Sequence, residues 1–478
     1  MMKKPDQPSY DRSNLRQGIV HIGVGNFHRA HMAVYLDDLF ALGRDQDWAI
    51  LGAGVRPTDA AMRGMLAAQD FRSTVIELDP AGPKARIIGS MTGFVPVEPD
   101  NRALIAAMSA ASIRIVSLTV TEGGYYIDPA TGQFDPSHPD MQADALAPDR
   151  PATAFGAIIA ALKARKTAGT PPFTVMSCDN LPGNGHVARN AIKGLAALSD
   201  PGLAAWIQAN VAFPNGMVDR ITPATGPRER ALAAEFGLDD PAPVTCEPFR
   251  QWVLEDHFPA GRPALELVGV TFTPDVHAFE TMKIRILNGG HAIIAYPAGL
   301  LGIEYVHEAM AHPLIAGFLD KIERAEILPH VPPVPDTELP DYLSLIQSRF
   351  ANPHIADTVR RLCLDGTNRQ PKFIIPTLRD NRAAGTLPEG LILLSALWCR
   401  YCFGTTDAGA TIDANDPQWS LLQTRSQAAR QDPATWLGMA EIYGDLAADK
   451  PVLAAFSAAL ARIWETGTEA TLRHYLGA

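Results

Sequence analysis

The first half of the chain alternates short apolar runs with longer amphipathic stretches. Four of the runs are rich in β-branched and other apolar side chains without polar alternation, which is typical of strands buried in a parallel sheet. These four are residues 18–25, 48–54, 113–120 and 172–177. Two further strands are predicted over residues 71–80 and 85–97, and helices over residues 26–43, 60–70 and 154–165. The alternation continues to about residue 200 and predicts an α/β domain with a doubly wound sheet.

Beyond residue 291 the pattern changes to amphipathic and apolar helices with few convincing strands between them. A chain of 478 residues is also too long for one ordinary core. We therefore expect two domains: an α/β domain over residues 1–275 and a mostly helical domain over residues 276–478.

Residues 273–291 are predicted to form one helix, with Thr273 as N-cap and a weak far end at the two glycines 289 and 290. At about 100° per residue, four polar side chains share one face of this otherwise apolar helix. They are Glu280, Lys283, Asn288 and His291. The stripe is either the solvated side of the helix or a catalytic face, because a desolvated lysine has a lowered pKa and can act as a general base.

The strand at residues 18–25 runs into a G-x-G turn formed by Gly23 and Gly25, and Asn26 and Phe27 open the next helix. This arrangement either makes a tight turn or binds the pyrophosphate of a dinucleotide at backbone N–H groups. The usual third glycine of the fingerprint is replaced by His28, so the motif alone is weak.

An acidic residue that binds the adenosine ribose would be expected at the end of the second strand. Asp59 is the nearest candidate, although it can equally cap the following helix, and Arg56 could meet a 2′-phosphate. NAD is therefore preferred over NADP, and NADP stays possible.

Ligands in doubly wound sheets lie beyond the carboxyl ends of the strands. Thr121 and Glu122 follow the strand at residues 113–120 and could face the cofactor. Asn180 lies in the same way at the end of the strand at residues 172–177. Asp219 lies in the segment 211–223, and the pattern leaves open whether it pairs with Arg220 or reaches the active site.

The balance of charges narrows the class of partner. A net charge of −11 without a basic arm argues against nucleic acid and favours a small-molecule substrate. No apolar run is of signal-peptide type or long enough to span a bilayer, so we expect a cytoplasmic protein that uses no membrane. Five cysteines suit reduced thiols, and no Cys or His cluster has metal-ligand spacing, so no metal is expected. A monomer is compatible with the sequence, which does not determine the oligomeric state.

Several separated motifs together resemble the mannitol dehydrogenase family, the polyol-specific long-chain dehydrogenases. They are HIGVGNFHRAH at 21–31, SCDN at 177–180, VAFPNGMVDRITP at 211–223, KIRILNGGH at 283–291 and DGTNRQPKF at 365–373. The resemblance covers most of the chain. It implies a Rossmann-type sheet domain followed by a mostly helical domain, and an NAD- or NADP-dependent enzyme without catalytic zinc that oxidises a sugar alcohol to a ketose.

The resemblance also implies roles for individual residues. Lys283 becomes the general base, and Asn180 and Asn288 bind the reacting oxygen. His291 contacts the same part of the substrate, Asp219 is the signature aspartate near the pocket, and Glu280 lies beside the proton path from the lysine. Arg361 and Lys372 are candidates for contacts to the remaining hydroxyl groups.

The reaction expected from this resemblance is the oxidation of D-mannitol to D-fructose with NAD. Rival substrates in the same family are D-arabinitol, D-sorbitol or a hexuronate, as in a fructuronate reductase, where Arg361 or Arg369 could bind the carboxylate. A rival of another class is a dinucleotide-binding sensor without turnover. It is disfavoured because Lys283, Asn288, His291 and Asn180 are all present.

Overall fold

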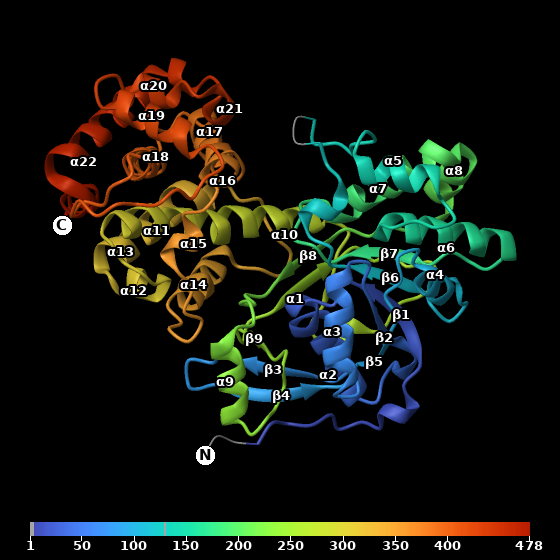
Figure 1. Cartoon of the computed structure of the whole chain (residues 1–478). Coiled ribbons are helices and arrows are strands. Elements are labelled where there is room, and N and C mark those ends of the chain that lie inside the picture. Colours follow the sequence, from blue (N-terminus) through green and yellow to red (C-terminus); the bar gives the residue numbers. More distant parts are fainter. Residues whose placement is uncertain (1–3, 129–130) are drawn as a thin grey trace. The chain divides into compact units, whose positions relative to one another are not determined.

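The chain folds into two compact units, Met1–His277 and Ala278–Ala478 (Figure 1). The structure is a computed structural model that describes residues 4–128 and 131–478. The first unit contains three β-sheets with helices around them, and the second is built from helices.

The largest sheet of the first unit is parallel throughout, in the order β5-β2-β1-β6-β7. Its strands are β5 (Met91–Phe94), β2 (Ala49–Ala53), β1 (Gln17–Ile22), β6 (Ile115–Leu118) and β7 (Thr174–Ser177). The four apolar runs predicted as buried strands are thus confirmed, and the sheet has the Rossmann-type arrangement. The strand order reverses between β1 and β6, which is where open α/β sheets bind ligands.

Two small sheets take the remaining strands. One has the order β4-β3-β9 and the other β11-β10-β8. Their strands are β3 (Ser73–Glu77), β4 (Lys84–Ile88), β9 (Val244–Cys246), β8 (Gly216–Asp219), β10 (Gln251–Leu254) and β11 (Thr271–Phe272). The prediction of one strand over residues 85–97 was wrong, because β4 and β5 belong to different sheets. The chain turns between them at Gly89, whose N–H donates to Asp37 Oδ1 at 2.8 Å.

Nine α-helices and four 3₁₀ turns are described in the first unit. The helices are α1 (Asn26–Ala30), α2 (Met32–Ala41), α3 (Pro57–Ala67), α4 (Arg102–Ser109), α5 (Pro139–Leu146), α6 (Ala154–Ala168), α7 (Asn184–Ser199), α8 (Pro201–Asn210) and α9 (Pro227–Glu235). The turns are η1 (Arg12–Asn14), η2 (Gln46–Trp48), η3 (Glu122–Tyr125) and η4 (Leu265–Val268). The single helix predicted over residues 26–43 is broken at His31, whose φ of −121° and ψ of −93° are not helical.

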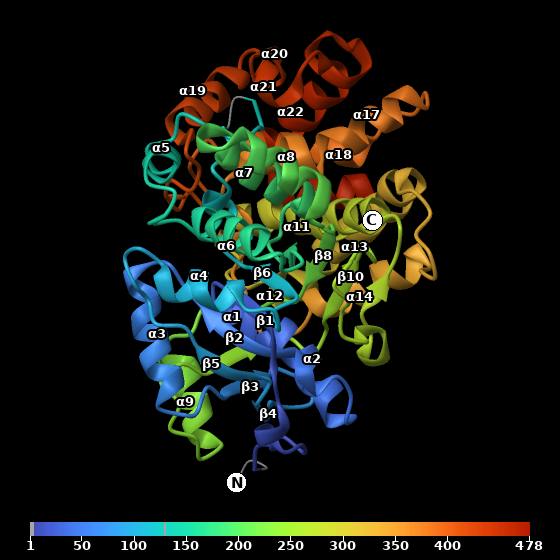
Figure 2. The ribbon, with the colours of Figure 1, turned by 90° about the vertical axis from the view of Figure 1, so that its right-hand side faces the viewer.

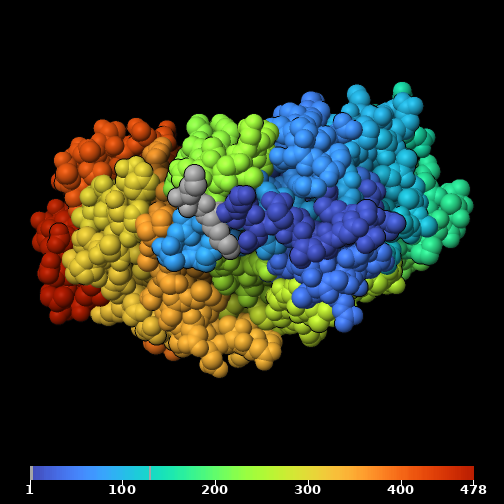
Figure 3. Space-filling view, turned by 90° about the horizontal axis from the view of Figure 1, so that it is seen from below, coloured from blue at the N-terminus to red at the C-terminus, as the bar shows by residue number. Residues whose placement is uncertain are grey.

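The parallel sheet is covered on both faces. Val20 and Val116 point into a core shared with α4, α6, α7 and α8, while Ile19 and Ile115 point into a core shared with α2 and α3. Successive residues of one strand face opposite sides, so a strand buried on both faces must be apolar throughout. Helix α6 lies beside α4 and α7 on the first face (Figures 1 and 2). The N-terminal segment lies on the surface of the same unit, where the Asp6 N–H donates to the Ala85 carbonyl (Figure 3).

The second unit is mostly helical, as predicted. Among the described residues, the last strand is β11, which ends at Phe272. It begins within α10 (Val276–Met282), which continues as η5 (Lys283–Asn288) and α11 (Gly289–Leu300). The remaining helices are α12 (Val306–Ala311), α13 (Pro313–Ile322), α14 (Leu339–Phe350), α15 (Val359–Leu362), α16 (Gly366–Phe373), α17 (Ile375–Ala383), α18 (Glu389–Tyr401), α19 (Trp419–Ala429), α20 (Ala434–Leu437), α21 (Ala440–Tyr443) and α22 (Lys450–Leu476). A π-helical segment, η6 (Glu323–Ile327), and two 3₁₀ turns, η7 (Leu328–His330) and η8 (Leu446–Ala448), complete it.

Helix α18 forms the centre of this unit. Its residues from Gly390 to Tyr401 are all buried, and it packs against α11, α13, α19 and α22. The apolar sequence of this helix on every side fits such a position, because a helix buried all round has no solvated face. Cys399 and Cys402 lie here as buried free thiols, and burial raises their pKa.

Candidate active site

The turn after β1 has the geometry that a dinucleotide-binding turn requires. Gly23 has a φ of +100°, and a Cβ on it would lie 2.8 Å from the Thr119 carbonyl carbon, so only glycine fits. Gly25, by contrast, is exposed, and a Cβ there would meet nothing closer than the Gly23 oxygen at 4.0 Å. The backbone at Gly25 is therefore open to a ligand.

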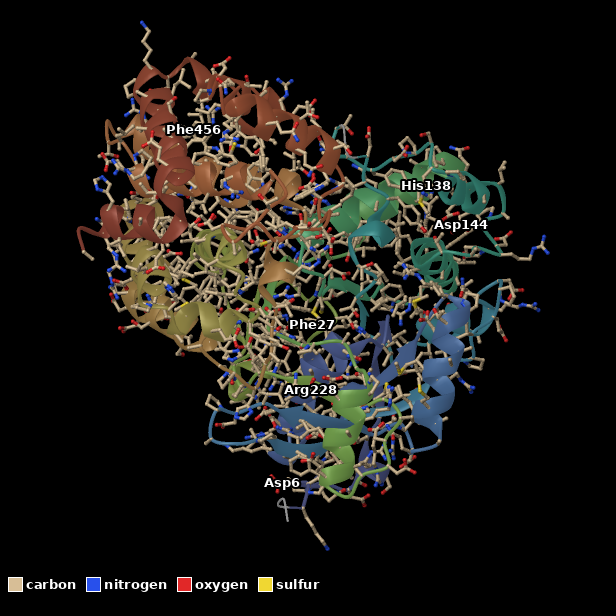
Figure 4. All side chains as sticks on the ribbon, turned by 60° about the vertical axis from the view of Figure 1, so that its left-hand side comes forward. Asp6, Phe27, His138, Asp144, Arg228 and Phe456 are labelled. Atoms are coloured by element: carbon tan, nitrogen blue, oxygen red, sulfur yellow. The ribbon has the colours of Figure 1, made fainter. Side chains whose placement is uncertain are left out.

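The side chains of Asn26 and Phe27 have structural partners. Asn26 Nδ2 donates to the Pro223 carbonyl at 3.1 Å and to Thr225 Oγ1 at 2.9 Å, which ties the turn to the loop after β8. Phe27 stacks on the ring of His31 at 4.7 Å between centroids; Figure 4 labels Phe27. What these two residues can offer a ligand is mainly the backbone at the start of α1.

His28, which takes the place of the third glycine, lies beneath the turn. Its ring is 1% exposed and stacks on His21 at 3.4 Å between centroids, and neither nitrogen has a hydrogen-bond partner among the described residues. His21 in turn contacts Ser117 Oγ at 2.8 Å and Thr119 Oγ1 at 2.9 Å. Burial lowers the pKa of His21 to about 3 and lowers that of His28 as well, so both rings are neutral near pH 7.

Asp59 lies at the end of β2, where an acid was expected. Its Cγ would stand 2.5 Å from a Cβ built on Gly54, the residue that follows the strand. Oδ2 of Asp59 accepts a hydrogen bond from the Arg56 N–H at 2.9 Å, so the carboxylate also caps α3. The two interpretations of Asp59 are therefore compatible: one oxygen caps the helix, while the side chain stays partly exposed beside the strand end.

Thr121, Glu122 and Asn180 are all exposed. Thr121 and Glu122 follow β6, and Asn180 follows β7, while the Gly23 turn follows β1. Because β1, β6 and β7 are parallel neighbours, these residues lie along one edge of the sheet. The structure thus brings together every cofactor-binding candidate at the edge where ligands bind in such sheets.

Asp219, the last residue of β8, is buried. The next residue, Arg220, donates hydrogen bonds to three groups of the first unit. Arg220 donates to Glu77 Oε1 at 2.6 Å, to the Ala30 carbonyl at 2.6 Å and to the Glu247 carbonyl at 3.0 Å. Burial lowers the pKa of His31 to about 3, and the charge of Asp219 acts in the opposite direction on the same ring. Asp219 therefore lies near the histidine of α2's N-cap.

The predicted helix at residues 273–291 differs from the structure in three respects. It begins at Val276 instead of Pro274, it passes through a π-helical segment at η5, and it runs on through Gly289 and Gly290 to Leu300. A π-helical turn holds more residues than an α-helical one, so the angular positions calculated at 100° per residue do not hold across η5. π-Helical turns are rare and occur frequently at functional sites.

Lys283 and Glu280 are both buried on this helix, at 6% and 7% exposure. Lys283 is the first residue of η5, and Glu280 lies one turn before it in α10. The interpretation of the polar stripe as a solvated surface is therefore wrong for these two residues. A lysine held inside the protein is the arrangement that general base catalysis needs.

Asn288 and His291 lie at the other end of η5. Asn288 Oδ1 and His291 Nε2 are buried and have no hydrogen-bond partner among the described residues of the chain. The ring of His291 stacks on Phe350 at 4.2 Å between centroids. Burial, with the nearby charge of Arg361, lowers the pKa of His291 to about 3, so the imidazole is neutral at physiological pH.

Arg361 and Lys372, the substrate-contact candidates, lie on α15 and α16. The Arg361 guanidinium pairs with Asp357 through both Nε and Nη2, and its charge reaches His291. Arg369 donates to the Leu362 carbonyl at 3.0 Å, which places it beside α15. Lys372 is exposed to solvent on α16.

Two buried acids that lie close to site candidates were not singled out in the sequence analysis. Asp179 precedes Asn180 and accepts three hydrogen bonds. Glu323 is fully buried near Gly290, with both carboxylate oxygens lacking a partner among the described residues, and burial raises its pKa well above the usual value. The sequence signal for Asp179 was its place at a strand end, whereas Glu323 sits in an ordinary amphipathic pattern and gave none.

Within the described ranges, no group of three or more His, Cys, Asp or Glu residues is placed to hold a metal ion. The same residues include no helix of sufficient length and apolar character to cross a bilayer.

Comparison with known families gives two matches that together span most of the chain. Residues 17–267 match the domain described as the mannitol dehydrogenase Rossmann domain. Residues 275–464 match the mannitol dehydrogenase C-terminal domain.

Individual relatives cover the full length. Mannitol 2-dehydrogenase of Cereibacter sphaeroides is 72% identical over 478 residues, 100% of both chains. Mannitol 2-dehydrogenase of Pyricularia oryzae is 41% identical over 477 residues, 98% of this chain and 95% of the relative.

Two solved structures are similar over nearly the whole chain. The ternary complex of Pseudomonas fluorescens mannitol 2-dehydrogenase with NAD and D-mannitol is 42% identical, with a TM-score of 0.85, and covers 100% of this chain and 97% of that one. A substrate-free D-sorbitol dehydrogenase is 35% identical, with a TM-score of 0.92, and covers 98% and 97%.

Proposed function

The chain belongs to the mannitol dehydrogenase family, and on this premise we propose that it oxidises D-mannitol to D-fructose with NAD. The observation that carries the proposal is the 72% identity, over the full length of both chains, to the mannitol 2-dehydrogenase of Cereibacter sphaeroides. The complex of the Pseudomonas fluorescens relative with NAD and D-mannitol supports the same cofactor and substrate. The cytoplasmic location and the monomeric state stay predictions.

The residues at the sheet edge fit a dinucleotide. Gly25 leaves its backbone open, and Asp59 presents a carboxylate at the end of β2, which suits a ribose hydroxyl and repels a 2′-phosphate. Thr121 and Glu122 line the same edge after β6. NAD supplies the hydride acceptor when bound, and these residues hold it.

Lys283 is our candidate for the general base. A hydride leaves the alcohol carbon only as the hydroxyl proton departs, so a base must come within about 2.6 to 3.2 Å of that oxygen. The lysine side chain is buried, and its amine can accept the proton when it is in the neutral form. Glu280, one helical turn away, is proposed to pass this proton on towards solvent.

Asn180 and Asn288 are proposed to hold the developing alkoxide. A carboxamide N–H group donates well to an oxygen that gains charge in the transition state. The Oδ1 atom of Asn288 is buried and has no hydrogen-bond partner among the described residues, and the two ends of a carboxamide are interchangeable by a flip. These donors and Lys283 supply what a Lewis acid supplies in other alcohol dehydrogenases, so we propose a reaction without a catalytic metal.

The remaining candidates are assigned to binding. His291, neutral because of its burial, can donate or accept a hydrogen bond at the same part of the substrate. Arg361 and Lys372 are proposed to contact the other hydroxyl groups, and Asp219 to act near the pocket.

D-Sorbitol is the rival substrate that a specific observation favours, because a D-sorbitol dehydrogenase has the same fold over the whole chain. Initial rates with D-mannitol, D-arabinitol, D-sorbitol and D-mannonate, each with NAD and with NADP, separate the alternatives. We expect the highest kcat/KM for D-mannitol with NAD. A preference for sorbitol or arabinitol would change the substrate, turnover of mannonate alone would indicate a fructuronate reductase, and no turnover would revive the sensor.

A further inference from the structure

A buried carboxylate joins the loops that follow β6 and β7. Asp179 is 8% exposed and directly precedes Asn180. Its Oδ1 accepts from the Thr121 N–H at 2.9 Å, and its Oδ2 accepts from the Val120 N–H at 3.0 Å and from the Tyr125 hydroxyl at 2.6 Å. One side chain therefore binds the loop after β6 at three points.

The backbone of Asp179 is fixed as well. The side chain of Asn184, which is fully buried, donates to the Asp179 carbonyl at 3.0 Å and to the Gly216 carbonyl at 2.8 Å. Asn184 Oδ1 also accepts from the Gly216 N–H at 2.9 Å. The chain on the N-terminal side of Asn180 is thus held from both its side chain and its main chain, which sets where the Asn180 side chain starts.

The loop on the other side of this contact has a conformation that needs support. Thr121 has a φ of +66°, a region that a residue with a Cβ rarely adopts. Such a conformation persists only where surrounding contacts hold it, and these conformations cluster at functional sites. The hydrogen bond from the Thr121 N–H to Asp179 is one such contact.

The position of the carboxylate is costly for the fold. Burial raises the pKa of Asp179, the three hydrogen bonds lower it, and the nearby charge of Glu122 raises it further. A neutral side chain at this place would avoid the cost of burying a charge. The network is thus more elaborate than packing alone requires.

We propose that Asp179 is a positioning residue that ties the cofactor-facing Thr121 and Glu122 to the substrate-binding Asn180. This inference rests on the proposed function. Thr121, Glu122 and Asn180 then keep fixed positions relative to one another, so that the position of the cofactor relative to the reacting oxygen is fixed as well. Misplacement of a reacting group by about 1 Å can cost roughly 100-fold in rate, so the effect of loosening this tie falls on kcat.

The main variant is Asp179→Asn, which keeps the shape of the side chain. Its NH2 group replaces one carboxylate oxygen and so faces an N–H or O–H donor from which that oxygen accepted a hydrogen bond. A milder variant is Tyr125→Phe, which removes one of the three hydrogen bonds and keeps the ring packed against Phe155, at 5.5 Å between centroids. We expect kcat for D-mannitol and NAD, per folded enzyme, to fall roughly 10- to 100-fold in Asp179→Asn. Tyr125→Phe should show a smaller fall in the same direction.

The chain offers a matched control in Asp144, which Figure 4 labels. Asp144 is 4% exposed and accepts from the Ala152 N–H at 2.7 Å, from the Thr153 N–H at 3.1 Å and from Thr153 Oγ1 at 2.6 Å. It therefore makes the same set of bonds, two backbone amides and one hydroxyl, without a tie to any site candidate. Asp144→Asn should lower Tm as Asp179→Asn does and leave kcat unchanged.

The primary isotope effect on kcat is the readout that a purely structural role would not move; it is measured with D-mannitol deuterated at both C2 and C5, because these two carbons are equivalent by symmetry. In Asp179→Asn it should rise above the wild-type value, because hydride transfer becomes slower than the other steps. A lower Tm with kcat within twofold of wild type and an unchanged isotope effect would overturn the inference. If Asp179→Asn does not fold, Tyr125→Phe decides by the same two measurements. If the wild-type enzyme shows no turnover, the proposed function is refuted, and this inference with it. If the wild-type enzyme turns over D-mannitol and the variants do so at the same rate, only the inference is refuted.

Discussion

Asp59 lies directly over Gly54 at the carboxyl end of β2, so that any side chain at Gly54 would collide with the carboxyl group of Asp59. Asp59 follows Gly54 by five positions in the sequence, and the start of α3 folds the acid back over the strand. Asp59, which the sequence offered as the nearest candidate for the expected acid, therefore lies at the end of the strand in space. It also explains why a glycine follows β2.

Replacement of Asp59 by Asn should change the choice of cofactor. The carboxamide oxygen can still accept from the Arg56 N–H, so the cap of α3 is kept. The charge that favours a ribose hydroxyl is lost, and a hydrogen bond to a charged group contributes about 1.5 to 3 kcal/mol. We expect kcat/KM for NAD to fall roughly 10-fold and that for NADP to rise. If kcat/KM for NAD and kcat/KM for NADP are each the same in Asp59→Asn as in wild type, Asp59 acts only as a helix cap.

Lys283→Ala should abolish most turnover while the cofactor still binds. General base catalysis contributes about 10² to 10⁴ in rate, and the Lys283 side chain is buried, at 6% exposure. We expect kcat to fall by that factor and to recover in part at high pH, where solvent base replaces the amine. NADH binding, followed by fluorescence, should stay within about threefold of wild type. Near-normal activity at pH 7 would remove the base assignment.

Asn288→Ala should lower kcat much more than it raises KM for D-mannitol. The loss of one donor to a developing oxyanion typically costs about 10² to 10³ in kcat. The change leaves η5 with a good helix former, so the fold should persist, which far-UV circular dichroism can check. If KM rises and kcat stays constant, Asn288 binds the substrate in its ground state and the oxyanion role is wrong.

The buried histidines of the first unit predict acid sensitivity. Burial lowers the pKa of His21 and of His31 to about 3, and lowers that of His28, whereas the unfolded chain titrates near the ordinary value of about 6.5. Between these values the unfolded state binds more protons, so stability is complete above about pH 6.5 and falls as the pH falls, by about 1.4 kcal/mol per pH unit for each histidine.

Replacement of His28 by Phe tests this pH dependence. The phenyl ring can stay stacked on His21, and one titrating group is removed. The free energy of unfolding, measured by urea denaturation between about pH 6.5 and 5, should then fall less steeply with decreasing pH than in wild type. The difference in slope should be about 1.4 kcal/mol per pH unit. Parallel slopes for wild type and His28→Phe would contradict the neutral, buried state of His28.

Much of the fold was readable from the sequence because burial leaves a local signature. The four strands β1, β2, β6 and β7 are buried on both faces, so their apolar runs stand out from the amphipathic helices between them. The break at His31 and the separation of β4 from β5 were missed, because both depend on contacts made far away in the sequence. Residue pattern alone could not reveal them.

The candidate site shows the same division. Lys283, Asn288 and His291 could be proposed as site residues because polar side chains interrupt an apolar helix. The π-helical segment that contains Lys283 was missed, since such a turn changes the period only locally. The place of Asp179 at a strand end is visible in the sequence, but its three hydrogen-bond donors lie 54 to 59 positions earlier in the chain, so no local pattern predicts that it holds the loop after β6.

The central claim is that this chain oxidises D-mannitol with NAD by means of its own lysine and amide groups. The most direct measurement is NADH formation from D-mannitol by enzyme treated with a chelator and freed of metal, with the sugar product identified. We expect undiminished turnover and one D-fructose for each NADH. Loss of activity that returns on addition of zinc, or a product other than D-fructose, would contradict it.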